Sequence, residues 1–175
     1  MKVLLIGSGG REHAMAWKLA QSPLTTELII APGNAGTADL GHNINISVDD
    51  HADLVRYAVD NNIDLVVVAP DQPIVDGLCD LLDQAGIKAF GPSAAAARIE
   101  GSKIWSDDLM TKYGIPTAES IAFSDSALAI EYGRSRPEGL LVVKADGLAA
   151  GKGVILPDTY DDLDTAIIGM LDDEA

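Results

Sequence analysis

Short apolar runs alternate with helix-forming stretches over the first half of the chain, and this alternation constrains the fold more than any other feature of the sequence. The apolar runs predict strands at Lys2–Ile6, Glu27–Ile30, Ile44–Ser47, Ile63–Ala69 and Lys88–Phe90. Helical patterns lie between them, up to about Gln21, over His51–Asn61 and over Pro73–Ala85. Strands that alternate with helices predict an α/β domain, doubly wound around a mostly parallel sheet.

The pattern changes after Ser93, and we place a domain boundary at about residue 100. Beyond it the sequence predicts one strand at Thr117–Phe123 and a glycine-rich hairpin that begins near Leu140. The expected helices are Ala94–Glu100, Gly101–Tyr113, Ala127–Gly133 and Tyr160–Leu171. The chain is therefore expected to contain domains over residues 1–100 and 101–175.

Three loops of the first domain follow predicted strands and carry small or charged residues: Gly7–Gly10, Gly33–Gly36 and Pro70–Pro73. Ligands of such folds bind at the carboxyl ends of the strands, so we expect the three loops to share one rim. The candidate binding residues on that rim are Gly9, Gly10, Arg11, Glu12, Asn34 and Asp71. For His13, capping or packing at the helix start is the favoured interpretation.

The first of these loops carries part of a dinucleotide-binding fingerprint. Gly7 and Gly9 occupy its first two glycine positions, but Glu12 stands where a third small residue should allow close packing of helix and strand. The second strand ends in Ile30-Ala31-Pro32, without the acidic residue that binds a ribose. The sequence thus disfavours a nicotinamide-dependent dehydrogenase, although amide groups at a helix start still favour an anion.

The stretch Lys144–Val154 reads K-A-D-G-L-A-A-G-K-G-V between two apolar runs. Glycine-rich turns expose successive N–H groups that form an anion-binding concavity, and lysine adds compact positive charge. A P-loop is excluded because Gly153 follows Lys152 in place of Ser or Thr, and a strand comes next in place of a helix. We interpret the stretch as a lid hairpin that closes over a polyphosphate; the alternative is an ordinary glycine-rich hairpin.

The charge and cysteine content restrict partners and compartment. The net charge of −15 argues against nucleic acid or an anionic membrane as a partner. No apolar run approaches the ~20 residues of a membrane span, and the chain opens directly into a strand, so we expect no signal peptide. The single Cys79 excludes an internal disulfide, fits a reducing cytoplasm and has the helical spacing of a packed thiol.

Four separated strings occur in order along the chain. They are G-S-G-G-R-E-H-A at Gly7–Ala14, P-G-N-A-G-T at Pro32–Thr37, F-G-P-S at Phe90–Ser93 followed by G-S-K at Gly101–Lys103, and the lid string. Together they resemble the glycinamide ribonucleotide synthetases (phosphoribosylamine–glycine ligases), a family of ATP-grasp enzymes. The chain departs from the family at Ala69–Pro73, which reads A-P-D-Q-P in place of G-P-E-x-P, and at Trp105, where the family commonly has Phe.

The resemblance implies a pre-ATP-grasp, Rossmann-like substrate domain followed by the beginning of an ATP-grasp domain. It implies ligation of glycine to 5-phosphoribosylamine through a glycyl phosphate, which gives glycinamide ribonucleotide, ADP and phosphate in purine biosynthesis. It places phosphoribosylamine at the rim residues, with no protein nucleophile. It places ATP at Lys103, Lys144, Gly147, Leu148, Ala149, Ala150, Gly151, Lys152 and Gly153. The family's magnesium ligands belong to a later part, so we expect no metal site here and a catalytically incomplete chain.

Several alternatives remain open. The chain could be a non-catalytic module that binds nucleotide or phosphosugar, or part of another purine-pathway ATP-grasp ligase such as a carboxylase. It could be a truncated chain or one piece of a split enzyme, with a separate carboxyl-terminal half or a second copy as its partner. Lys103 and Lys152 could be solvated surface charges.

Overall fold

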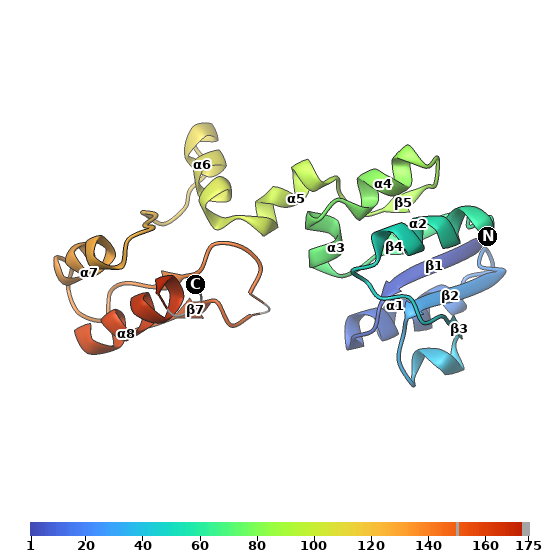
Figure 1. Ribbon diagram of the computed structural model, residues 1–175, viewed down its shortest axis with the longest axis horizontal. Helices are drawn as coiled ribbons and strands as arrows, with labels where there is room; N and C mark the ends of the chain where they lie inside the picture. The colour runs from blue at the N-terminus through green and yellow to red at the C-terminus, as the bar shows by residue number, and fades with distance from the viewer. Residues whose placement is uncertain (150, 173–175) are drawn as a thin grey trace. The chain divides into compact units, whose positions relative to one another are not determined.

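The computed structural model describes residues 1–149 and 151–172. These residues form two compact units that divide between Arg98 and Ile99. In Figure 1 the first unit runs from blue to green and the second from yellow to red. Each unit has a hydrophobic core of its own.

The first unit is built on a parallel sheet with the strand order β3-β2-β1-β4-β5. The strands are β1 (Lys2–Gly7), β2 (Glu27–Pro32), β3 (His42–Asn43), β4 (Leu65–Val68) and β5 (Ala89–Phe90). The helices are α1 (Gly10–Ala20), the 3-10 turn Thr37–Asp39, α2 (His51–Asp60), α3 (Asp71–Val75), α4 (Leu78–Gln84) and α5 (Ala94–Gly101), which runs across the unit boundary. The strand order reverses at β1 and β4, which confirms the predicted doubly wound α/β class.

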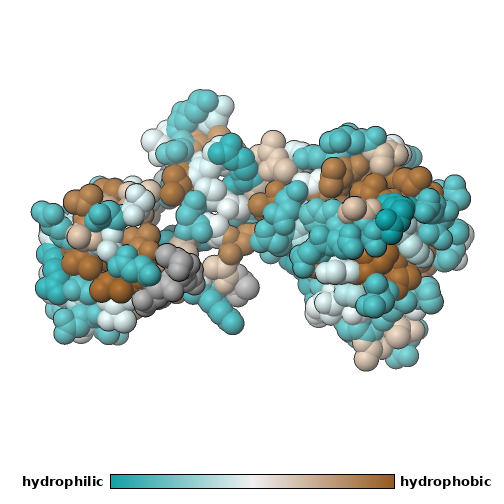
Figure 2. Space-filling model, in the orientation of Figure 1, coloured by the Kyte–Doolittle hydropathy of each residue, from teal (hydrophilic) through white to brown (hydrophobic). Residues whose placement is uncertain are grey.

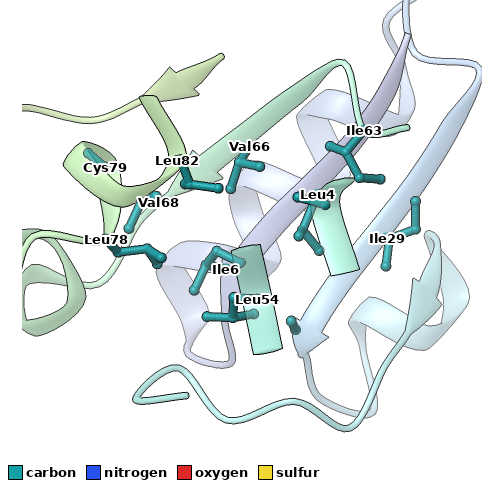
Figure 3. Close-up of a cluster of buried hydrophobic side chains, with 12 residues drawn as sticks. Leu4, Ile6, Ile29, Leu54, Ile63, Val66, Val68, Leu78, Cys79 and Leu82 are labelled. Carbon is teal, nitrogen blue, oxygen red and sulfur yellow. The ribbon is translucent and has the colours of Figure 1, made fainter. Parts of the chain in front are cut away.

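Helices cover both faces of this sheet (Figure 1). Successive side chains of a strand point to opposite faces, so β1 contributes to two clusters. Leu4 and Ile6 pack with α2 and α4 on one face, as Figure 3 shows. Val3 and Leu5 pack with α1 on the other. Full burial of each such side chain stabilises the unit by about 1.5–3 kcal/mol, and this core fixes the positions of the strand ends.

The third strand lies at His42–Asn43, not at the predicted Ile44–Ser47. Only His42 and Asn43 pair with β2, and the Ile44 amide adds one further hydrogen bond to the Ile30 carbonyl at 2.9 Å. Ile44 and Ile46 are half-buried against the core below α2. Their alternation therefore reflects packing of an extended segment on the core, which the sequence pattern does not distinguish from strand pairing.

The predicted helix Pro73–Ala85 is two helices. It begins earlier, at Asp71, and breaks at Gly77, whose φ of +93° lies in the left-handed region that glycine adopts at little cost. Leu78 and Leu82 of α4 are buried in the core, whereas Leu81 is exposed. Val59 of α2 is also exposed.

The second unit contains α6 (Lys103–Tyr113), α7 (Ser126–Arg134) and α8 (Tyr160–Leu171), with the antiparallel pair β6 (Val143–Lys144) and β7 (Val154–Ile155). Its core is small, and Ala129 of α7 packs there with Leu163 and Ile167 of α8. The predicted strand Thr117–Phe123 has no regular secondary structure and pairs with no strand of the described residues. A strand needs a neighbour to pair with, and within the described residues β6 and β7 pair only with each other.

Apolar side chains lie on the surface of the second unit, as brown patches in Figure 2. Many of them flank the hairpin: Leu140, Val142, Val154, Ile155 and Leu156 are all exposed. In the part of the chain that the structure describes, none of the helices combines the length and the apolar character needed to cross a membrane.

Candidate functional site

Three loops of the first unit meet at the carboxyl edge of its sheet. The Asn34 side-chain amide after β2 donates to the Ser8 carbonyl after β1 at 2.8 Å. Arg11, at the start of α1, pairs through Nη1 with Asp71 Oδ1 at the start of α3, 3.3 Å away. The structure thus brings the rim loops together at the point where the strand order reverses, which is where such folds bind ligands.

Glu12 folds back over the first loop and is only 5% exposed. Its carboxylate accepts hydrogen bonds from the Gly9 amide at 2.7 Å and from Arg11 Nε at 3.0 Å. A Cβ atom at Gly7 would collide with Glu12 Cγ, and one at Gly9 would lie 2.8 Å from Glu12 Oε2. Both glycines are therefore required by the glutamate, and the carboxylate itself now satisfies the loop amide that the sequence assigned to an anion.

Arg11 lies between two carboxylates. The hydrogen bond with Glu12 raises the pKa of Arg11 above its ordinary value, and the nearby charge of Asp71 adds to this. Together they outweigh partial desolvation, which lowers the pKa. Its side chain is half exposed. A guanidinium has five N–H donors in a rigid fork, so Arg11 can bind both carboxylates and still offer N–H groups to an anionic ligand.

The Asn34 side chain forms hydrogen bonds that hold the second loop in place. Its Oδ1 accepts from the amides of Gly36 (2.8 Å) and Thr37 (3.0 Å). The buried Thr37 hydroxyl in turn accepts from the Asn34 amide at 2.8 Å. His13 lies against Gly36, where a Cβ atom would collide with the imidazole, so His13 packs α1 on this loop. Sequence reasoning missed Thr37, although a threonine three residues after an asparagine is a signal for such a turn.

The predicted glycine-rich hairpin forms in the second unit as a short ladder with a long tip. Lys144 ends β6 opposite Val154, and the Ala145 amide donates to the Gly153 carbonyl at 2.9 Å. Within the tip, the Lys152 amide donates to the Ala149 carbonyl at 2.8 Å. Gly147 and Gly151 have φ values of +96° and +79°, which side chains rarely allow. Leu148 is half-buried, and the predicted contact Ala150 lies outside the described residues.

Asp146 joins the base of this hairpin to the first turn of α6. Its Oδ1 accepts from the amides of Lys103 (2.6 Å) and Ile104 (3.2 Å), and its Oδ2 lies 3.1 Å from the Ser102 hydroxyl. Lys103 Nζ donates in the opposite direction, to the Gly147 carbonyl at 2.8 Å. The Asp146 carboxylate therefore supplies the negative charge that the start of α6 favours. Sequence reasoning missed Asp146.

Partial burial raises the pKa of Asp146, but hydrogen bonds to its carboxylate lower the pKa by more. These bonds come from the main-chain amides of Ile104, Lys103 and Gly147 and from the Ser102 hydroxyl. The pKa of Asp146 therefore lies below its ordinary value. The carboxylate stays ionised at neutral pH. Lys144 and Lys152 are both exposed, so the hairpin presents two accessible ammonium groups.

Within residues 1–149 and 151–172, no three His, Cys, Asp or Glu side chains are arranged so that they could hold a metal ion. Cys79, near the start of α4, is a free thiol buried in the core of the first unit. Burial, and secondarily the charge of Asp80, raise the pKa of this thiol.

Models of one protein family match the whole length of the chain. The family model described as Phosphoribosylglycinamide synthetase, N domain, matches residues 1–100, and the one described as Phosphoribosylglycinamide synthetase, ATP-grasp (A) domain, matches residues 101–175. The phosphoribosylamine–glycine ligase of Haemophilus influenzae is 49% identical over all of this chain and 41% of its own length. That of Agrobacterium fabrum is 53% identical over 88% of this chain and 36% of its own.

Two solved structures also match most of the chain. The crystal structure of phosphoribosylamine–glycine ligase from Thermotoga maritima is 31% identical and matches with a TM-score of 0.75, over 97% of this chain and 39% of that one. The N5-carboxyaminoimidazole ribonucleotide synthetase of the same organism has a TM-score of 0.68 at 20% identity, over 94% of this chain and 43% of that one, which shows a shared fold alone. The chain thus spans about two fifths of the length of the curated relatives it matches. The resemblance seen in its motifs is confirmed, and the chain belongs to the phosphoribosylglycinamide synthetase family.

Proposed function

We propose that the chain is the amino-terminal part of an ATP-dependent ligase that joins glycine to 5-phosphoribosylamine. ATP converts the glycine carboxylate, a poor electrophile, into a glycyl phosphate and leaves as ADP. The amine of phosphoribosylamine then attacks the acyl carbon and displaces phosphate, which gives glycinamide ribonucleotide. The observation that carries the proposal is the joint presence of the three-loop rim and the lysine-bearing hairpin in a member of this family.

The rim is proposed to hold phosphoribosylamine in a substrate domain over residues 1–100. Arg11 is the cation of this edge and suits a phosphate oxygen, while the exposed Asp71 suits an amine or a ribose hydroxyl. Gly9 and Gly10 allow close approach of the substrate to the main chain. Glu12 and Asn34 act mainly by holding the loops in place, because hydrogen bonds within the protein occupy their side chains.

The hairpin is proposed to cover the ATP phosphates in an ATP-grasp region that begins at residue 101. Lys103 and Lys144 contribute positive charge at its base, and Lys152 does so at its tip. The backbone of Gly147, Leu148, Ala149, Gly151 and Gly153 forms the cover. Magnesium is proposed to bind with ATP through residues of the family's carboxyl-terminal part. The partner is a carboxyl-terminal part of the family or a second copy, and the compartment is the cytoplasm.

The test measures ADP release by this chain with ATP, magnesium, glycine and freshly made phosphoribosylamine. We expect no turnover by the chain alone, and glycine-dependent turnover when the carboxyl-terminal part of a relative is added. If the completed enzyme binds nucleotide without turnover, the chain is a binding module. If turnover depends on bicarbonate in place of glycine, the enzyme is a carboxylase and the assignment of glycine as its substrate is wrong.

The hairpin assignment has its own variant. Lys144→Ala should weaken ADP binding by the completed enzyme about tenfold or more, because a charge-assisted bond to phosphate is lost while β6 keeps its main-chain pairing. Lys112→Ala, at the far end of α6, is the matched control and should leave the affinity unchanged. Unchanged ADP affinity in Lys144→Ala, with an intact circular dichroism spectrum, would sink the lid assignment.

A further inference from the structure

The base of the hairpin and the start of α6 are joined by hydrogen bonds that run in both directions. Main-chain amides of Lys103 and Ile104 donate to the Asp146 carboxylate, and Lys103 Nζ donates back to the Gly147 carbonyl. Ser102 completes the set, because its hydroxyl contacts Asp146 and also accepts from the Trp105 amide at 3.1 Å. We call Ser102, Lys103, Asp146 and Gly147 the clasp. It joins segments more than forty residues apart in the sequence.

The hairpin needs such a contact because its own ladder is short. Two residue pairs, Val143 with Ile155 and Lys144 with Val154, make up the ladder, and one further main-chain bond extends it. Both residues of β7 are exposed. An isolated two-stranded hairpin is marginally stable at best in water, so its ladder alone does not fix the direction in which the tip points.

The clasp also decides which groups can meet an anion. The first amides of α6 would attract a phosphate through the helix dipole, but the Asp146 carboxylate already occupies them. A second anion at that place would be repelled. Phosphate oxygens are thereby directed toward the lysine side chains and the exposed main chain of the hairpin.

We propose that Asp146 is a positioning residue, which holds the base of the hairpin on α6 and so places Lys103 and Lys144 on either side of the nucleotide phosphates. The clasp is a property of this chain; its consequence for nucleotide rests on the proposed function. Asp146 does not itself contact the nucleotide, since its oxygen atoms bind the first turn of α6. An ordinary helix cap would stabilise α6 without changing the hairpin, and this difference defines the test.

The test compares amide hydrogen exchange of the hairpin in the unchanged chain, Asp146→Ala and Asp146→Asn. In Asp146→Ala we expect exchange of the Ala145 amide, which is bonded to the Gly153 carbonyl, to accelerate about tenfold. Asp146→Asn keeps an oxygen acceptor but loses the charge, so we expect a smaller acceleration, about threefold. Asp108→Asn, an exposed carboxylate on the same helix, is the matched control for net charge and should leave exchange unchanged.

Equal hairpin exchange in the unchanged chain and in both Asp146 variants would overturn the proposal, as would acceleration confined to α6. Should Asp146→Ala fail to fold, Asp146→Asn decides alone. A second arm measures ADP affinity of the completed enzyme, in which Asp146→Ala should bind at least about fivefold more weakly than Asp108→Asn. Equal affinity despite a loosened hairpin would also overturn the proposal. Absence of ADP binding by the unchanged enzyme would instead refute the proposed function, and hairpin exchange would then decide the role of Asp146.

Discussion

Replacement of Glu12 by alanine should destabilise the first unit far more than removal of an ordinary surface carboxylate. The Glu12 carboxylate is buried and accepts hydrogen bonds from the Gly9 amide and Arg11 Nε. Loss of the carboxylate leaves the Gly9 amide without this acceptor in a partly buried place. It also removes the contact that seats Arg11 at the edge of the sheet.

The magnitude follows from these two bonds. A donor left unsatisfied costs about 1–3 kcal/mol when it is buried, and the hydrogen bond of the Gly9 amide is partly buried. Arg11 is half exposed, so water replaces most of its lost partner and its share is about 0–1 kcal/mol. We therefore expect Glu12→Ala to lower the free energy of unfolding by about 1–4 kcal/mol, compared with the roughly 5–15 kcal/mol of a typical domain. Glu12→Gln keeps an oxygen acceptor for the Gly9 amide and should cost about half as much.

The assay is urea unfolding, monitored by hydrogen exchange and mass spectrometry on peptides from residues 2–98. These peptides report unfolding of the first unit separately from the second. Glu27→Ala is the matched control, because Glu27 forms an exposed ion pair with Lys2 in the same unit and its loss should cost no more than about 1 kcal/mol. If Glu12→Ala costs no more than Glu27→Ala, the first loop is not held by this carboxylate and our account of the rim is wrong.

Three further outcomes follow from the structure. Gly36→Ala should destabilise the first unit by about 1–3 kcal/mol through overpacking against the His13 imidazole, and the double variant with His13→Ala should recover most of the loss, as thermal unfolding would reveal. Cys79 should resist alkylation by iodoacetamide at pH 8 until the chain is unfolded, because its thiol is buried and its pKa raised; rapid labelling of the folded chain would contradict this. The pKa of Asp146 is lower in the folded chain than in the unfolded one, so its contribution to stability is present above about pH 4 and is lost on further acidification. The difference in urea midpoint between the unchanged chain and Asp146→Asn should therefore narrow as the pH falls from 6 to 3, and a difference that widens would contradict the pKa assignment.

The sequence predicted the fold where local signals and burial agree. The helix Tyr160–Leu171 was predicted with the bounds observed, because its apolar stripe packs on α7 and Thr159 caps its start. The strand prediction was wrong at Ile44–Ser47, because the apolar side chains there pack on the core while the backbone does not pair with a strand. The helix prediction was wrong at Gly77, where a left-handed backbone conformation breaks the helix in two. The strand expected at Thr117–Phe123 depends on a neighbouring strand, which no local pattern can supply.

The candidate sites were predicted as sets of residues rather than as hydrogen-bond networks. Motif positions identified the rim loops and the hairpin, because glycines and charged residues near strand ends are visible in a sequence. Partners distant in sequence are not visible, so the contacts of Arg11 with Asp71 and of Lys103 with Gly147 could only come from the structure. Asp146 escaped notice for the same reason: its partners lie more than forty residues earlier.

Both sites follow one electrostatic arrangement. In each, a carboxylate of the chain accepts hydrogen bonds from main-chain N–H groups at the start of a helix, one for Glu12 and two for Asp146. A cationic side chain, Arg11 or Lys103, lies near each carboxylate. The chain has a net charge of −15, and its own carboxylates already occupy the N–H groups at these two helix starts. These helix starts therefore do not attract a further anion. Under the proposed function, recognition of a phosphate depends on Arg11 in the first unit and on Lys103, Lys144 and Lys152 in the second. The affinity of both sites for anions should consequently fall as ionic strength rises, since the cations that carry it are all at least partly exposed.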